Sequence, residues 1–250
     1  MLAEERYTAI LNLVNQKQAI TVPELTAALG ASEATIRRDL NALHRQGRLH
    51  KVHGGATAIK QSFIADEPDI PTKSSLHVEE KEAIARYAAA QIQDDDVVFL
   101  DAGTTTLRML NYLPACKATF VTNGITLASR MVAMGLKAFI VGGQLKPGTE
   151  AVIGGQAAAT LSAYNFTKAF LGTNGVSIKQ GYTTPDPEEA LVKGKAMEQA
   201  YMSYVLADAS KFGIITAMTF APLHKACIIT NVLPDKSYTQ HAIVKEVGNA

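Results

Sequence analysis

The stretch Ser32-Glu33-Ala34-Thr35-Ile36-Arg37-Arg38-Asp39-Leu40 combines the start of a helix with two adjacent arginines. Ser32 is a good N-cap residue because its hydroxyl can accept a hydrogen bond from a first-turn backbone N–H that has no partner in the helix. Ile36 and Leu40 lie four positions apart and share one helix face, so the two arginines lie off that face. The stretch therefore predicts a helix that is buried on one side and presents two cations on the other.

Two further helices are expected before this stretch. Residues 3–17 carry apolar side chains at helical spacing. Thr21, followed by Glu24 three positions later, predicts a capping box at the start of a second helix. Gly30 is expected to end that helix, because glycine adopts the left-handed conformation without steric cost. The N-terminal region is thus predicted to hold three short helices.

A basic hairpin is expected after the third helix. Residues 48–55 alternate apolar and basic side chains and end in the pair Gly54-Gly55. Three helices, an arginine pair on the third and such a hairpin form the layout of a winged helix-turn-helix, whose third helix enters the major groove of DNA. The hairpin would contact phosphates. The alternative is a three-helix bundle whose arginines form a solvated face.

The distribution of charge favours DNA binding by the N-terminal region. The chain of 250 residues has a formal net charge of only +1, but residues 1–60 carry +3 and the remainder −2. Five basic residues fall between Arg37 and Lys51. A local basic patch on a nearly neutral protein is typical of a small DNA-binding head.

Composition also narrows the class of protein. No apolar run approaches the roughly 18 residues of a membrane-spanning helix, and residues 1–6 lack the apolar region of a signal peptide. We therefore expect a cytoplasmic protein with no membrane partner. Cys116 and Cys227 lie in apolar stretches without metal-ligand spacing, which predicts reduced core thiols rather than a disulfide. Neither a metal nor a cofactor is expected.

Short apolar strands alternate with helices in the rest of the chain. Such alternation predicts an α/β domain with a parallel sheet covered by helices on both faces. We expect a DNA-binding domain at residues 1–57, a linker at 58–78 and the α/β domain at 79–250. The expected strands are 97–100, 118–121, 138–141, 169–171, 204–206 and 226–229, and the expected helices are near 81–92, 105–113, 125–134, 155–163 and 188–201.

Small, hydroxylated or amide residues follow nearly every expected strand. Because the carboxyl ends of parallel strands meet at one edge of a sheet, these residues are expected to line a common binding site. The candidates are Asp101, Gly103, Thr104, Thr105, Thr106, Thr122, Asn123, Gly142, Gly143, Gly172, Thr173, Asn174 and Gly175.

The loop at residues 101–106 is the strongest candidate for anion binding. Gly103 allows a close turn, the three threonines offer hydroxyls, and the helix that follows supplies free N–H groups. The loop lacks the spacing and lysine of a Walker loop, and it lacks the GxGxxG pattern of dinucleotide-binding folds. The alternative is that the threonines only cap the helix. Together with the other strand-end loops, they favour a phosphate group.

Charged residues outside the strand ends complete the candidate site. Glu189 and Lys193 lie one helical turn apart and could face a polyhydroxylated ligand. The alternative is that the acids at this helix start only stabilise its dipole. Lys211 follows another expected strand and could add a cation near a phosphate.

The N-terminal motifs resemble the head of the DeoR family of bacterial transcription regulators. The similar segments are ASEATIRRDLNAL at 31–43 and LHKVHGGA at 49–56. In that family the recognition helix and wing bind operator DNA. The resemblance implies operator contacts from Ser32, Glu33, Thr35, Arg37, Arg38, Lys51 and His53.

The remaining motifs resemble the sensor domain of the same family. They are DAGTTT, VTNG, VGG, GTNG and ADASKFG, in that order. The resemblance implies a fold like that of ribose-5-phosphate isomerase and a phosphorylated sugar as effector. The segments GYTTPDPEEA and VGGQLKPGTEAVIG are most similar to repressors of fructose operons, which implies fructose 1-phosphate. Binding to repeated half-sites of operator DNA would need a homo-oligomer, a dimer or a tetramer.

A sugar-phosphate isomerase with an accessory DNA-binding head is the competing hypothesis. Where such an enzyme would carry Gly-Ala-Asp, this chain has Gly172-Thr173-Asn174. An amide cannot act as a general acid or base, but it can still hydrogen-bond a sugar hydroxyl. We therefore expect binding without catalysis. A DNA-binding module with no ligand is the third possibility.

Overall fold

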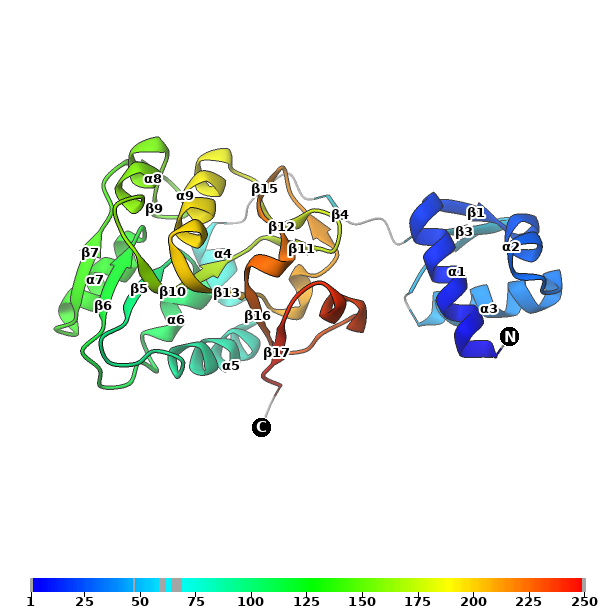
Figure 1. Ribbon diagram of the computed structural model, residues 1–250, viewed down its shortest axis with the longest axis horizontal. Coiled ribbons are helices and arrows are strands. Elements are labelled where there is room, and N and C mark those ends of the chain that lie inside the picture. The colour runs from blue at the N-terminus through cyan, green and yellow to red at the C-terminus, as the bar shows by residue number, and fades with distance from the viewer. Residues whose placement is uncertain (1, 47, 59–61, 64–68, 249–250) are drawn as a thin grey trace. The chain divides into compact units, whose positions relative to one another are not determined.

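The computed structural model describes residues 2–46, 48–58, 62–63 and 69–248. The chain divides into two compact units, residues 1–61 and 62–250 (Figure 1). Within the described ranges, no helix combines the length and the apolar character needed to cross a membrane.

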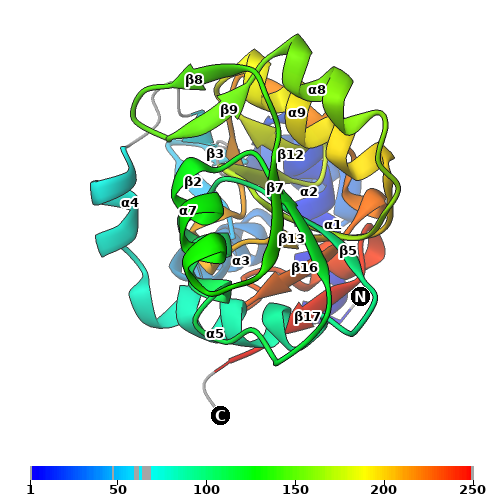
Figure 2. The ribbon, with the colours of Figure 1, turned by 90° about the vertical axis from the view of Figure 1, so that its left-hand side faces the viewer.

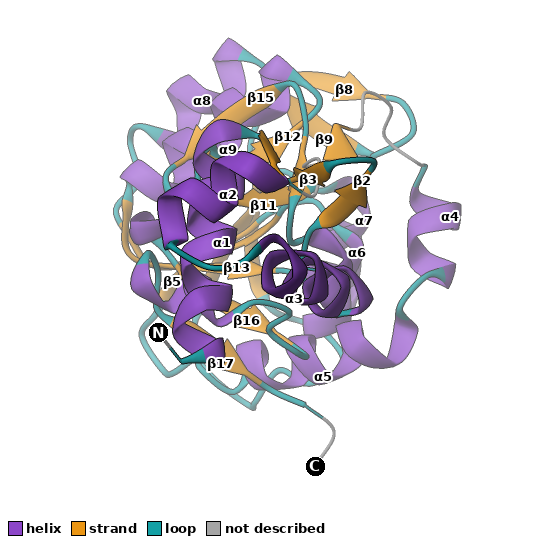
Figure 3. Cartoon of the chain, turned by 90° about the vertical axis from the view of Figure 1, so that its right-hand side faces the viewer, coloured by secondary structure: helices purple, strands orange, loops and turns teal. Residues whose placement is uncertain are grey.

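The first unit packs three helices against a small antiparallel sheet with strand order β1-β3-β2 (Figures 1 and 3). Its core is formed by apolar side chains of all three helices, including Ile10, Leu25 and Leu40, none of which is exposed. The elements are α1 (Ala3–Lys17), β1 (Ala19–Thr21), α2 (Val22–Leu29), α3 (Glu33–Arg45), β2 (His50–Val52) and β3 (Gly55–Thr57).

The helix boundaries in this unit follow from local capping. Thr21 and Glu24 form the predicted capping box of α2, and Gly30 ends that helix in the left-handed conformation at φ 61°. The Ser32 hydroxyl accepts a hydrogen bond from Thr35 N at 3.3 Å at the start of α3. The expected hairpin is β2–β3. The third strand, β1, was not expected, and it passes so close that a Cβ at Gly55 would lie 2.3 Å from Ile20 O.

A seven-stranded, wholly parallel sheet forms the centre of the second unit. Its strand order is β17-β16-β13-β10-β5-β6-β7, which confirms the predicted α/β class. The strands are β5 (Val97–Leu100), β6 (Thr119–Thr122), β7 (Lys137–Ile140), β10 (Phe166–Gly172), β13 (Ala200–Leu206), β16 (Cys227–Thr230) and β17 (Val244–Glu246).

Helices cover both faces of this sheet because successive strand residues point to opposite sides. In β5, Phe99 packs in the cluster with α8 (Gly155–Leu161) and α9 (Pro187–Glu198). Its neighbours Val98 and Leu100 pack in the other cluster. That second cluster includes side chains of α5 (Val78–Ala89), α6 (Thr104–Met109) and α7 (Ile125–Ala133). Figure 2 shows α8 and α9 on one side of the strands and α5 and α7 on the other.

Several small strands at the carboxyl edge were not expected from the sequence. They form a hairpin of β8 (Gln144–Lys146) and β9 (Ala151–Ile153) and an antiparallel sheet of β11 (Gly175–Ser177), β12 (Gly181–Thr184) and β15 (Met218–Ala221). Two-to-four-residue strands carry little periodicity, because pairing with a partner strand rather than local sequence stabilises them.

The segment expected as a linker, 58–78, contains regular structure. β4 (Ser62–Phe63) pairs in parallel with β14 (Ile214–Ile215), and α4 (Ile70–Ser75) is capped by Asp69. Residues 59–61 and 64–68 of the segment lie outside the described residues. The division between the two units falls at 61/62, so most of the segment belongs to the second unit.

The strand order reverses direction between β5 and β10. From β5 the chain proceeds outward through β6 and β7, whereas β10, β13, β16 and β17 follow on the other side. Ligands of open α/β sheets bind outside the carboxyl ends of the strands at such a switch point. Asp101 follows β5 and Gly172 ends β10, so both lie at this point.

Candidate functional site

The exposed side of α3 carries the predicted DNA-binding side chains. Arg38 is exposed and makes no ion pair with any residue in the described part of the chain. Arg37 is also exposed and forms an ion pair with Glu33 at 3.2 Å. The Thr35 and Ser32 hydroxyl oxygens are 2.9 Å apart. Ile36 and Leu40 are fully buried beneath these polar residues, as the spacing predicts.

The hairpin lies beside the same helix. Lys51 Nζ of β2 donates to Asn41 Oδ1 of α3 at 2.8 Å. His53 is an exposed residue of the turn between β2 and β3. Recognition helix and wing therefore present cations on adjoining surfaces, which is the arrangement that a winged helix-turn-helix uses on DNA.

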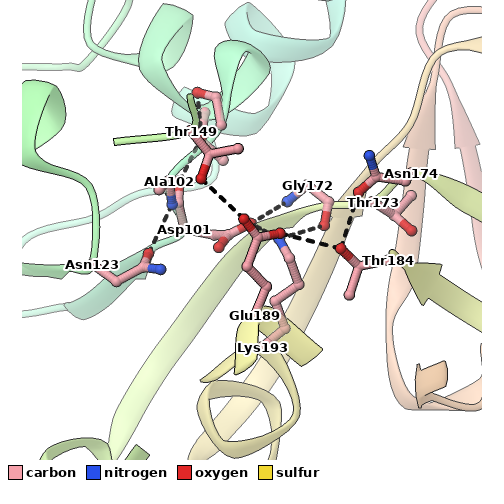
Figure 4. A network of polar contacts seen from close by, with 12 residues as sticks. Asp101, Ala102, Asn123, Thr149, Gly172, Thr173, Asn174, Thr184, Glu189 and Lys193 are labelled. Carbon is pink, nitrogen blue, oxygen red and sulfur yellow. Dashed lines mark hydrogen bonds and ion pairs between the residues drawn. The ribbon is translucent and has the colours of Figure 1, made fainter. Parts of the chain in front are cut away.

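A buried ion pair occupies the switch point of the large sheet (Figure 4). Lys193 Nζ of α9 contacts Asp101 Oδ2 and also donates to Gly172 O at 3.2 Å. Gly172 N donates to Asp101 Oδ2 at 3.0 Å. Side-chain exposure is 1% for Asp101 and 7% for Lys193. The carboxyl ends of β5 and β10 are thus joined through one carboxylate and one ammonium group.

Glu189 forms a second polar cluster one turn earlier on α9. Its Oε1 accepts hydrogen bonds from Thr149 Oγ1 and Lys146 Nζ, each at 3.0 Å. Its Oε2 accepts from Thr184 Oγ1 at 3.2 Å, and that hydroxyl lies 3.2 Å from Asn174 Oδ1. Figure 4 shows the two clusters side by side. Glu189 and Lys193 thus belong to neighbouring clusters, and their predicted contact with a polyhydroxylated ligand stays a prediction.

The pKa values of two carboxyl groups, Asp101 and Asp186, are shifted in opposite directions. Burial raises the pKa of Asp101 above its ordinary value, although the Lys193 ammonium opposes the shift. Hydrogen bonds from Lys146 and from the backbone of α9 outweigh partial burial and lower the pKa of Asp186. Each carboxyl group pairs with one lysine: Asp101 with Lys193, and Asp186 with Lys146.

Three of the predicted site residues hold the loops together. The Thr106 hydroxyl donates to Asp101 O at 2.6 Å, and the Thr122 hydroxyl donates to Leu100 O at 2.6 Å. Neither side chain is exposed. Asn123 joins two loops by accepting from Ala102 N and donating to Val152 O. These groups have their hydrogen bonds satisfied within the protein, so we assign them a supporting role.

Two of the predicted glycines, Gly143 and Gly175, allow close packing of the backbone. A Cβ at Gly143 would lie 2.9 Å from Ile153 O, and one at Gly175 would lie 2.4 Å from Ile214 O. Gly142 precedes Gly143 in the loop after β7, where it is exposed. The Thr173 hydroxyl donates to Gly175 O at 2.8 Å.

Sequence reasoning missed Lys81, a buried cation that interacts with the predicted Lys211. Lys81 is the first residue of the apolar stripe of α5 and is only 5% exposed. The pKa of Lys81 is lowered to about 8, mainly by burial and in part by nearby Lys211, Arg108 and Lys73, while Asp208 opposes the shift. The sequence did contain a signal for this residue: Lys81 occupies a position of the helix face at which an apolar side chain is expected.

The predicted anion loop lines a pocket of the second unit. The empty space in it, including its open mouth, is about 350 Å³. Gly103 and Thr104 contribute to its wall, whereas Thr105 does not. Thr149, which donates to Glu189, lines the same pocket. The remaining lining residues are Ile70, Ala102, Leu107, Gly124, Thr126, Leu127 and Glu150.

Curated proteins similar to this chain are transcriptional regulators. The uncharacterized HTH-type transcriptional regulator FruR of Bacillus subtilis (strain 168) is 42% identical, with 99% of each chain covered. The HTH-type transcriptional regulator IolR of the same organism is 35% identical, over 92% of this chain and 91% of IolR. Among solved structures, ribose 5-phosphate isomerase from Plasmodium falciparum has a TM-score of 0.39 and 12% identity, over 53% and 52% of the chains.

Two family models match most of the chain. The DeoR-like helix-turn-helix domain matches residues 6–62, and the DeoR C terminal sensor domain matches residues 76–232. These matches coincide with the winged head and with the α/β unit that carries the polar clusters. The chain therefore belongs to the DeoR family of transcriptional regulators.

Proposed function

We propose that this chain represses a sugar-utilisation operon and releases operator DNA when a phosphorylated sugar binds, with fructose 1-phosphate as the first candidate. The observation that carries the proposal is the meeting of two polar clusters at one switch point, where Thr149 of the second cluster also lines the pocket of the predicted anion loop. The head would bind operator half-sites as part of a homo-oligomer. The unit at residues 62–250 would bind the sugar.

The two ends of the ligand have different partners in this proposal. Carboxylate and amide oxygens accept hydrogen bonds from hydroxyls, so the Glu189 cluster and Asn174 suit the sugar. Lys81 and Lys211, together with the loop at Gly103–Thr105, suit the phosphate. Thr106, Thr122 and Asn123 support the loops from behind.

The choice of fructose 1-phosphate as the first candidate depends on similarity to a relative. FruR covers nearly the whole chain at 42% identity, and the segments around Thr184 and Thr149 are those expected to resemble fructose-operon repressors. Both threonines donate to Glu189, so these segments meet at the proposed sugar subsite. Fructose 1-phosphate is therefore the ligand to test first.

We further propose that the sugar is bound without being converted. Asp101 is held by Lys193, and Asn174 stands where an isomerase would place a carboxylate. Neither group is then available to move a proton between sugar carbons.

Thermal unfolding of the purified protein with four sugar phosphates tests the proposal. The panel contains fructose 1-phosphate, fructose 6-phosphate, tagatose 6-phosphate and ribose 5-phosphate. A ligand that binds only the folded state raises the melting temperature, by an amount that corresponds to about 2.7 kcal/mol at 100 times its Kd. We expect the largest rise with fructose 1-phosphate. If none of the four sugars raises the melting temperature, the sugar-phosphate proposal is contradicted. DNA binding then remains as the only proposed function.

Effector affinity is expected to fall above about pH 8, because Lys81 loses its proton there. A bound phosphate stabilises the ammonium form, so binding above this pH requires uptake of one proton. The Kd should then rise by about tenfold per pH unit, which is the slope for one proton. Calorimetric titrations between pH 7 and 10 measure this slope.

Lys81→Met is the test variant for this pH dependence. Loss of the ammonium group should weaken binding at pH 7 and flatten the profile above pH 8. Lys225→Met, at an exposed lysine of a short 3-10 helix (Leu223–Lys225), serves as the control and should keep the wild-type profile. An unchanged slope in Lys81→Met would show that another group titrates.

A further inference from the structure

Helix α4 brings a side chain from the segment between the two family domains into the pocket. Ile70 is the first residue of α4 and lines the pocket together with Thr104 and Thr149. The family matches end at residue 62 and resume at 76, so α4 falls between them. Ile70 supplies an aliphatic surface beside Thr149, which donates to Glu189.

The position of α4 depends on a few hydrogen bonds rather than on a core. None of its side chains is buried, and a helix of six residues is not stable by itself. Ile70 N donates to Gly148 O at 3.1 Å, and Arg108 Nη2 donates to Ser74 O at 2.9 Å. Lys81 Nζ donates to Lys73 O. Every one of these partners comes from an element of the proposed effector site.

Strand β4, which precedes α4 in the chain, is also connected to an element near the proposed effector site. β4 pairs with β14, which begins three residues after Lys211. A ligand that reorganises the 146–150 loop, Lys81 or the loop containing Lys211 therefore changes the partners of residues 62–63 and 70–75. Any signal along the chain from the sensor unit to the DNA-binding unit passes through these residues.

We propose that Ile70 contacts the bound effector and that α4 thereby transmits effector binding to the segment that leads to the DNA-binding unit. This inference rests on the proposed function, because it requires a phosphorylated sugar in the pocket. It adds to the site an apolar contact outside the polar clusters. It also identifies the element through which effector and operator affinities are coupled.

Ile70→Ala in the full-length protein tests the inference. The probe is the member of the four-sugar panel that most raises the melting temperature of the wild type. Loss of the apolar contact should weaken sugar binding by about tenfold, the effect of removing one to two buried methylene contacts. Operator affinity without sugar should stay within about twofold of wild type, which also reports correct folding. Leu76→Ala removes an exposed apolar side chain just after α4 and serves as the matched control.

The second readout is the ratio of operator affinities without and with saturating sugar. Coupling is reciprocal, so this ratio measures how strongly α4 links the two sites. Ile70→Ala should reduce the ratio, whereas Leu76→Ala should retain it. Unchanged sugar affinity in Ile70→Ala would overturn the contact, and an unchanged ratio would overturn the role of α4. Absence of any sugar binding by the wild type would overturn the proposed function itself.

Discussion

Replacing Lys193 with methionine is expected to lower the free energy of unfolding of the second unit by roughly 3–5 kcal/mol, because the variant leaves the buried Asp101 carboxylate without its counter-ion. For a unit of this size the loss corresponds to a fall in melting temperature of roughly 6–20 °C. Differential scanning calorimetry of the full-length protein measures the transition. A loss below about 1 kcal/mol would show that the pair is far more solvated than its burial indicates.

The double variant Lys193→Met with Asp101→Asn separates charge from packing. Removing the unpaired charge should restore most of the lost stability. Lys195→Met, on the same helix but with 30% of its side chain exposed, is the control and should cost less than about 1 kcal/mol.

The stability deficit of Lys193→Met, meaning the loss in its free energy of unfolding relative to wild type, should also depend on pH. Burial raises the folded-state pKa of Asp101, so as the pH falls the folded variant takes up a proton before the unfolded chain does. Proton uptake by the folded state stabilises it, and the deficit should be larger at pH 8 than at pH 5. The opposite trend would contradict the raised pKa.

Arg38→Ala is expected to weaken operator binding by about 5- to 150-fold, the range for one lost base contact of about 1–3 kcal/mol. Arg38 lies exposed on α3 among the predicted recognition residues and makes no ion pair with other described residues. The operator is first selected from random DNA by the purified wild type. Fluorescence anisotropy then measures affinity for this operator and for unrelated DNA.

Comparison with Lys51→Ala distinguishes base recognition from phosphate binding. Lys51 lies on the wing, and its loss should weaken binding to both DNAs. The slope of log affinity against log salt concentration should also become smaller by about one, because one phosphate contact is lost. Arg38→Ala should act mainly on the selected operator. Equal losses on both DNAs would show that Arg38 contacts phosphate. Effector binding should be unchanged in both variants, because both side chains belong to the first unit.

Local signals made the DNA-binding unit predictable from the sequence. The cap at Ser32, the capping box of Thr21 with Glu24 and the turn at Gly30 each act within about three residues, so their spacing alone indicates the structure. The alternation of apolar strands and helices likewise determined the α/β class, because buried parallel strands appear as short apolar runs between helical segments.

The proposed sugar site depends on contacts that sequence spacing does not contain. Asp101 and Lys193 are 92 positions apart, and Lys146 reaches Glu189 across 43 positions. The motifs predicted which residues lie at the strand ends, but not that Thr106 and Thr122 turn inward or that Lys81 is buried.

By itself, then, the sequence determined the alternation of the main strands and helices, the winged head and the set of polar strand ends, since these arise from interactions between near neighbours in the chain. Only the tertiary structure decided which polar groups are satisfied internally, which lysines are buried and where α4 packs. Those outcomes depend on burial and on hydrogen bonds between distant segments, and both exist only once the sheet has brought the segments together.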